Sequence, residues 1–213
     1  MERTKIDAIM RALIIVALFM VLLPLSSCGK EEKPSGKASV QSLSTYSSDS
    51  AFVEVKKKLQ ENPKDADAWY HLADLYDRNA QYTEAIDAYK KVLELKPTMG
   101  YAYLKMGTAY DRLNQPEEAV KVLKKATQRM PGFAVGYNNL GVAYGKLGKL
   151  SDEVTALQKA IKLRPTYTAA RFNLGMTYLK MKNKKGAMQE YESLKKFDDG
   201  AAEALQKEIR KAS

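Results

Sequence analysis

The chain has 213 residues, of which 45% are hydrophobic and 28% charged, and its formal net charge is +10. This hydrophobic fraction is too high for a chain that is disordered throughout, and the length allows one or two domains with a buried core. Because the sequence holds one cysteine and one histidine, it excludes an intramolecular disulfide and argues against a Cys/His zinc site or a Cys–His catalytic pair.

Residues 1–27 have the layout of a secretory signal peptide. Three basic residues precede an apolar run over residues 12–25, which is shorter than the roughly 20 residues that span a bilayer. The run ends in Leu25-Ser26-Ser27-Cys28, which resembles the lipobox of bacterial lipoproteins. The resemblance implies cleavage before Cys28, a covalent lipid on this residue, and stable anchoring in a membrane of the bacterial envelope by several acyl chains.

Residues 28–50 are expected to form the lipidated cysteine and a flexible tether. The segment after Cys28 has seven serines and no apolar periodicity. In lipoproteins, an aspartate after the cysteine is associated with retention in the inner membrane. Gly29 stands there instead, which favours the outer membrane, facing the periplasm. The alternative interpretation of Cys28 is an incidental thiol at the end of an uncleaved membrane anchor.

From residue 66 the sequence repeats with a period of 34 residues. A large residue, a Leu or Met, a small residue and a Tyr occupy positions i, i+3, i+4 and i+7, which form one face of an α-helix. A second helix with its own apolar positions follows, and a proline ends it in three of the repeats. The residues that recur at this period are Tyr76, Tyr110, Tyr144 and Tyr178; Pro97, Pro131 and Pro165; and Gly107, Gly141 and Gly175.

This pattern resembles the tetratricopeptide repeat. The resemblance implies an all-α fold, a right-handed solenoid of helix–turn–helix repeats with helical caps. The predicted repeats are residues 66–99, 100–133, 134–167 and 168–199. Residues 51–63 continue the apolar pattern of a second helix and are expected to cap the first repeat. Residues 201–211 are amphipathic and are expected to cap the last.

Two residues depart from the repeat pattern. Glu153 stands where the other repeats have Ala85, Ala119 and Ala187, a packed position at which an unpaired carboxylate is unfavourable. We expect local splaying that lets the Glu153 side chain reach water, and the alternative is pairing with a neighbouring lysine. Arg171 replaces an aromatic residue, and its aliphatic stem is expected to cover the same surface while its charge stays in water.

Signals for catalysis are weak, and we expect no enzyme. The glycines within Gly141–Lys146 faintly resemble a phosphate loop, but their spacing is wrong and the segment lies in a predicted helix. His71 has no serine, cysteine or second histidine in a catalytic arrangement. The carboxylates of Asp67, Asp74 and Asp77 lack a calcium-binding loop and are interpreted as a solvated helix face.

The resemblance implies a partner-binding groove on the concave surface, lined by the first helix of each repeat. Asn139 and Asn173 are equivalent, and they resemble two rungs of the asparagine ladder with which some tetratricopeptide proteins bind the backbone of an extended peptide. The alternative for every groove residue is ordinary helix surface. The expected groove residues are Tyr70, His71, Asp74, Asp77, Tyr101, Leu104, Lys105, Thr108, Asn138, Asn139, Val142, Phe172, Asn173 and Met176.

We therefore expect a membrane-anchored scaffold, without a cofactor or metal, that binds an extended segment of an envelope protein. The chain resembles the small lipoproteins of this kind that assist assembly of the type IV pilus secretin, and other envelope assembly pathways stay open. The alternative is electrostatic binding of an anionic envelope polymer or lipid, because repeats two to four each have a net charge of +3 while repeat one has −2. Export argues against nucleic acid as a partner.

Overall fold

The computed structural model describes residues 40–212, with side chains from residue 50 onward. The predicted signal peptide, Cys28 and the tether up to residue 39 lie outside the described residues. Within residues 40–212 the chain forms helices and no strand. The helices are α2 (Val40–Glu61), α3 (Ala66–Arg78), α4 (Tyr82–Leu95), α5 (Gly100–Arg112), α6 (Pro116–Arg129), α7 (Ala134–Lys146), α8 (Leu150–Leu163), α9 (Thr168–Lys180), α10 (Lys184–Leu194) and α11 (Asp199–Lys211).

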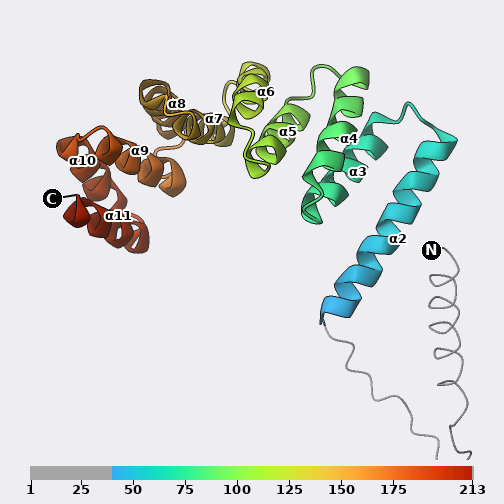
Figure 1. The fold of residues 1–213 in the computed structure, drawn as a ribbon, viewed down its shortest axis with the longest axis horizontal. Coiled ribbons are helices and arrows are strands. Elements are labelled where there is room, and N and C mark those ends of the chain that lie inside the picture. The colour runs from blue at the N-terminus through green and yellow to red at the C-terminus, as the bar shows by residue number, and fades with distance from the viewer. Residues whose placement is uncertain (1–39, 213) are drawn as a thin grey trace, which may run out of the picture. The chain divides into compact units, whose positions relative to one another are not determined.

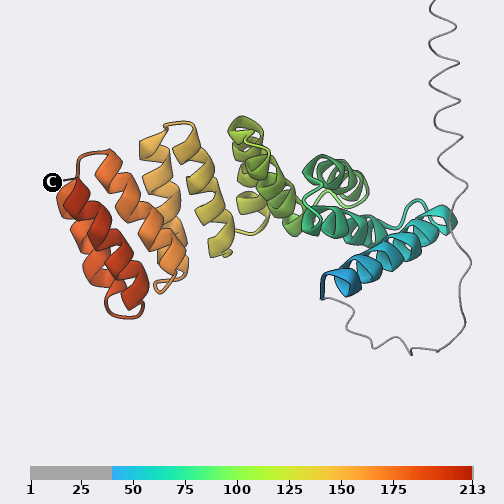
Figure 2. The same ribbon diagram turned by 60° about the horizontal axis from the view of Figure 1, so that its bottom comes forward.

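Each helix packs against the next along the chain (Figure 1). The first helices of neighbouring repeats also meet, because α5 contacts α7 and α7 contacts α9, while α11 contacts α9 in the same way. The turned view in Figure 2 shows the same succession of helices linked by short turns. Contacts between neighbours only, repeated along the chain, define the all-α solenoid that the 34-residue period predicts. Among the described helices, none combines the length and the apolar character that crossing a membrane requires.

The first described helix, α2, is longer than predicted. It begins at Val40 and ends at Glu61, so it takes in residues 40–50, which we expected to belong to the tether. Leu59 of this helix is buried against Ala68 and Leu72 of α3, which holds the C-terminal half in place. Once that half is helical, each further residue adds a backbone hydrogen bond without a new nucleus, and residues 40–50 contain no Gly or Pro to stop the helix.

The small residue of each first helix allows the second helix to approach closely. A Cβ built on Gly107 would lie 2.6 Å from Leu123 Cγ, and one on Gly141 would lie 2.8 Å from Leu157 Cγ. Both leucines are fully buried. The glycines are therefore needed for helix contact, which explains why they recur at the repeat period.

The helix α11 closes the array at its C-terminal end. Asp198 caps it by accepting a hydrogen bond from the backbone N–H of Ala201 at 2.9 Å. Its apolar face is buried, with Leu205 fully covered. A Cβ on Gly175 would lie 2.5 Å from Leu205 Cδ2, so α11 packs on α9 at its small-residue position. This geometry protects the last repeat from water.

The turn inside each repeat passes through one residue in the left-handed region. These residues are Ala80, Asn114, Gly148 and Lys182, with φ of 57°, 54°, 68° and 58°. They are spaced by 34 residues. Glycine and asparagine tolerate this conformation, whereas alanine and lysine are strained in it.

Replacing Ala80 or Lys182 with glycine is expected to raise the free energy of unfolding by about 0.5–1 kcal/mol. Glycine relieves the left-handed backbone strain of the folded state, which raises the free energy of unfolding. Its greater backbone entropy in the unfolded chain offsets part of this gain. Urea unfolding measures it, and Asn114→Gly is the matched control, with a smaller expected gain. A loss of stability in both variants would show that the turn does not store this strain.

Candidate functional site

Three pockets recur along the face formed by the first helices. The first pocket lies between α2 and α3, the second between α5 and α7, and the third between α7 and α9, with volumes of 280, 170 and 240 Å³. Each pocket is lined by one member of an equivalent set, His71, Asn139 or Asn173, which stand at the same position of repeats one, three and four. The face therefore carries a row of indentations set by the repeat.

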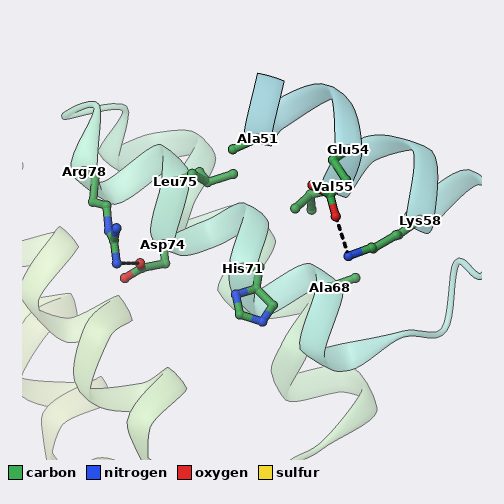
Figure 3. Close-up of a pocket in the computed structure, with 9 residues that line it drawn as sticks. All are labelled: Ala51, Glu54, Val55, Lys58, Ala68, His71, Asp74, Leu75 and Arg78. Atoms are coloured by element: carbon green, nitrogen blue, oxygen red, sulfur yellow. Dashed lines mark ion pairs between the residues drawn. The ribbon is translucent and has the colours of Figure 1, made fainter. Parts of the chain in front are cut away.

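The first pocket is shown in Figure 3, where its lining residues come from α2 and α3, His71 of α3 among them. Two ion pairs border it: Glu54 with Lys58 at 2.7 Å and Asp74 with Arg78 at 2.7 Å. The carboxyl group of Glu54 has a lowered pKa, because Lys58 donates a hydrogen bond to it and adds its charge. The rim of this pocket is thus occupied by pairs of opposite charge within each helix.

The junction between α3 and α5 is filled by the fourth member of the equivalent set, Lys105. Its Nζ lies 3.0 Å from Asp74 Oδ1 and 3.4 Å from Asp77 Oδ2. Burial alone would lower the pKa of Lys105, but the hydrogen bond and charge of Asp74, together with Asp77, raise it above the ordinary value. The chain's own lysine therefore occupies the acidic site between repeats one and two.

Asparagines link the later repeats. Asn139 donates from Nδ2 to Thr108 Oγ1 at 3.2 Å, and Asn138 donates to Asn139 Oδ1 at 3.3 Å. Asn173 donates to Asn138 Oδ1 at 3.1 Å. Each carboxamide both donates and accepts. The backbone of a bound segment can therefore replace these side-chain hydrogen bonds with its own, at little loss of hydrogen-bond free energy. The result is a polar row across repeats two, three and four.

Two predicted groove residues are buried instead. Leu104 is 7% exposed and packs in the core with Leu140 and Ala143, while Asn138 is also 7% exposed. Leu104 is therefore unavailable to a partner, and the prediction for it is wrong. The reason is that this position of the first helix points toward the neighbouring repeat rather than into the open face. Asn138 stays part of the polar row through its hydrogen bonds.

The aromatic residues predicted for the groove differ in exposure and contacts. Tyr70 is half-buried, edge-on to Tyr89 at 5.8 Å, and burial raises its pKa. Tyr101 is exposed and packs edge-on against Phe133 at 5.4 Å. Phe172 packs on the C-terminal core cluster and lines a wide hollow of 670 Å³. The groove residues that are half-buried and reachable are Asp74, Asp77, Lys105, Thr108, Asn139, Val142, Asn173 and Met176, and His71 is exposed.

The prediction that Glu153 reaches water is wrong. Its side chain is 4% exposed, lines the third pocket, and has no hydrogen-bond partner on Oε2. It fills the space beside Gly145, where a Cβ would lie 2.6 Å from Oε1. Gly145 itself stands where repeats one and two have Asp77 and Asp111. This paired departure, a carboxylate gained on one helix and lost on the other, is the sequence signal that would have placed Glu153 in the site.

The side chain of Arg171 is also less exposed than predicted. Its exposed fraction is 16%, and its Nη1 donates to Glu190 Oε2 at 2.8 Å, with Glu190 14% exposed. Arg171 Nε donates to the carbonyl of Pro165 at 2.7 Å. Trp69, the equivalent residue of repeat one, donates from Nε1 to Pro63 O at 2.9 Å. Arginine thus replaces tryptophan because it satisfies the same turn carbonyl, and Glu190 balances its charge.

Among the described residues, no cluster of three His, Cys, Asp or Glu side chains that could hold a metal ion is present. The acidic residues that do gather, Asp74 and Asp77, are bound by Lys105. The chemistry of the face is therefore hydrogen bonding and ion pairing.

The family comparison matches tetratricopeptide repeat models to residues 66–99, 100–131, 134–167 and 169–199. These matches agree with the four predicted repeats to within a few residues. No curated protein matches the chain by sequence.

Solved structures share the fold. MamA from Desulfovibrio magneticus RS-1 is 23% identical, with a TM-score of 0.66 over 79% of this chain and 90% of that one. YrrB, described as a TPR protein with an unusual peptide-binding site, is 22% identical, with a TM-score of 0.68 over 78% and 86%. PilW, described as a type IV pilus biogenesis factor, is 20% identical, with a TM-score of 0.68 over 81% of each chain. At these identities the likeness concerns the fold alone.

Proposed function

Because the chain belongs to the tetratricopeptide repeat family, we propose that it is a protein-interaction scaffold that binds an extended segment of a partner along its first-helix face. The observation that carries this proposal is the set of three pockets at equivalent positions, one between α2 and repeat one, one between repeats two and three, and one between repeats three and four, each lined by His71, Asn139 or Asn173. An extended segment spans several such junctions, and carboxamides can pair with its backbone N–H and C=O groups without selecting a sequence.

The test of this proposal is the removal of the two equivalent asparagines. Asn139→Ala and Asn173→Ala are each expected to weaken peptide binding up to about tenfold, since each removes one or two hydrogen bonds. Peptides selected from a random library on the full chain in detergent serve as the probe, and fluorescence anisotropy gives their affinity. Gln128→Ala, on the exposed side of α6, is the matched control and should leave binding unchanged. Equal affinity for all three variants would place the binding surface elsewhere.

We also propose that the scaffold is held at an envelope membrane by a lipid on Cys28, on the outer membrane and facing the periplasm. The support is the lipobox-like Leu25-Ser26-Ser27-Cys28 after a short apolar run. Labelling cells with an alkyne fatty acid should tag the wild-type chain and not Cys28→Ser. Persistent labelling of the variant would overturn the assignment. A partner in pilus or other envelope assembly follows from this location, and PilW offers a structural precedent for the fold in a pilus biogenesis factor.

A second candidate function is binding of an anionic envelope polymer or lipid through the basic repeats two to four, each with a net charge of +3. Such binding falls steeply with salt, because it depends on the release of counterions. The affinity for anionic vesicles tests this candidate. A drop of more than tenfold between low and physiological salt, with no change in the Asn139→Ala variant, would favour it over the peptide groove.

A further inference from the structure

We propose that the third pocket is a subsite for a basic side chain, lysine or arginine, of the bound segment, with Glu153 as its carboxylate. The inference rests on the proposed function, since it assigns chemistry to one position of that groove. The third pocket is formed between α7 and α9 by Val142, Gly145, Lys146, Glu153, Asn173, Met176 and Lys180.

Glu153 is buried and lacks a complete set of hydrogen bonds. Its side chain is 96% covered, and Oε2 has no hydrogen-bond partner among the described residues. A buried carboxylate without a donor is unfavourable, and such a group needs an explanation, of which a donor supplied by a ligand is one. Glu153 lines the third pocket, whose other lining residues belong to the first helices α7 and α9 and whose volume is 240 Å³, so a donor placed in this pocket would lie next to the carboxyl group.

Equivalent junctions within the chain differ in whether a lysine pairs with the carboxylate. Between repeats one and two, Lys105 binds Asp74 and Asp77. Between repeats two and three, Lys146 Nζ lies 2.6 Å from Asp111 Oδ1. Both junctions thus contain a carboxylate and one of the chain's own lysines. The junction between repeats three and four has the carboxylate of Glu153. Asn173 stands there in place of Lys105 and Lys180 in place of Lys146, but no ion pair forms at this junction within residues 40–212.

Two lysines, Lys146 and Lys180, lie at the rim of the third pocket. Lys146 is already paired with Asp111, and Lys180 is exposed and makes no ion pair within the described part of the chain. A basic rim does not prevent a second cation from binding, because Asp74 holds both Arg78, at 2.7 Å, and Lys105, at 3.0 Å. Arg78 is the equivalent of Lys146.

The other lining residues of the third pocket include apolar side chains that can cover the aliphatic part of a basic side chain. Val142 and Met176 are half-buried and line the same pocket, and they can cover the methylene groups of lysine or arginine. Asn173 lines the same pocket, and its carboxamide oxygen can accept a hydrogen bond, which suits the several N–H donors of a guanidinium. The pocket therefore combines an apolar wall with a buried anion.

The experiment is a selection from a random peptide library on the full chain in detergent, run in parallel on the wild type, Glu153→Gln and Asn173→Lys. The wild type should enrich lysine or arginine at one position of the peptides. Glu153→Gln should still select peptides but lose that enrichment. Asn173→Lys recreates the arrangement of Lys105, so its own ammonium should occupy Glu153 and remove the enrichment as well.

A binding titration then measures how much the basic residue of the peptide contributes to its affinity. Replacing the selected basic residue of the peptide by methionine should weaken binding to the wild type at least tenfold, and should change binding to Glu153→Gln less than threefold. A basic preference that persists in Glu153→Gln, or a wild-type pool with no basic preference, would overturn the inference while leaving the peptide-binding function intact. Selection of no peptide by any of the three proteins would remove the proposed function, and the inference with it.

Discussion

Replacing Arg171 with methionine is expected to lower the free energy of unfolding by about 3–5 kcal/mol, the usual loss when one partner of a buried ion pair is removed. The substitution leaves the Glu190 carboxylate, 14% exposed, without its donor. It also removes the hydrogen bond to the Pro165 carbonyl. Methionine covers nearly the same surface, so lost packing contributes little. Urea unfolding followed by circular dichroism measures the change.

The matched control is a double variant that gives repeat four the residues of repeat three at these two positions. There the equivalents of Arg171 and Glu190 are Tyr137 and Ala156, so the double variant Arg171→Tyr with Glu190→Ala removes both charges together. It is expected to lie within about 1.5 kcal/mol of the wild type, because a buried ion pair and a packed apolar pair are often nearly equivalent. If the free energy of unfolding falls equally in the single and double variants, Arg171 stabilises the fold through its packing and not through its charge.

Replacing Glu153 with alanine should have the opposite sign and raise the free energy of unfolding by about 1–3 kcal/mol, the cost of a buried polar group without a partner. Alanine is the residue of the other three repeats at this position, so the helix contact is preserved. Thermal and urea unfolding of the full chain in detergent measure the gain. Glu153→Gln controls for shape, since it keeps the volume and removes the charge.

A loss of stability in Glu153→Ala would mean that the carboxylate has a partner in solution. Lys180, at the rim of the same pocket, is the candidate. In that case Lys180→Met should lose as much stability as Glu153→Ala, whereas an unpaired carboxylate predicts no change from Lys180→Met. A gain in stability together with a loss of the basic-residue preference would show that the protein keeps a destabilising residue for binding.

Most of the fold could be predicted from the 34-residue period of the sequence. Tyrosines and glycines at 34-residue intervals specify the helix pairs because their spacing reflects direct contact, as Gly107 with Leu123 and Gly141 with Leu157 demonstrate. The start of α2 at Val40 was not predictable in this way. Serine-rich sequence favours a tether by composition, and whether a helix extends into it depends on the packed residues downstream, such as Leu59.

The candidate site was predictable in position but not in detail. Asn139 and Asn173 follow from the register, since equivalent positions lie on one face. What Lys105 does depends on carboxylates 28 and 31 residues earlier in the chain, and periodicity alone does not reveal which charged side chains meet. For Glu153 and Arg171 the sequence marked the departure, but each outcome depended on a second residue, Gly145 in one case and Glu190 in the other.

The hydrogen bonds from Trp69 to Pro63 and from Arg171 to Pro165 also bear on stiffness. They tie the first helix of repeats one and four to the preceding turn, so the angle at these two junctions is fixed by a bond as well as by packing. Tyr103 and Tyr137 stand at the same position in repeats two and three, and a tyrosine ring has no N–H to offer there. The inner junctions lack this tie to the preceding turn and are bridged instead between first helices, by Lys105 with Asp74 and by Asn139 with Thr108. A bound segment that displaced these polar contacts would loosen the middle of the array and leave the two ties to the turns intact.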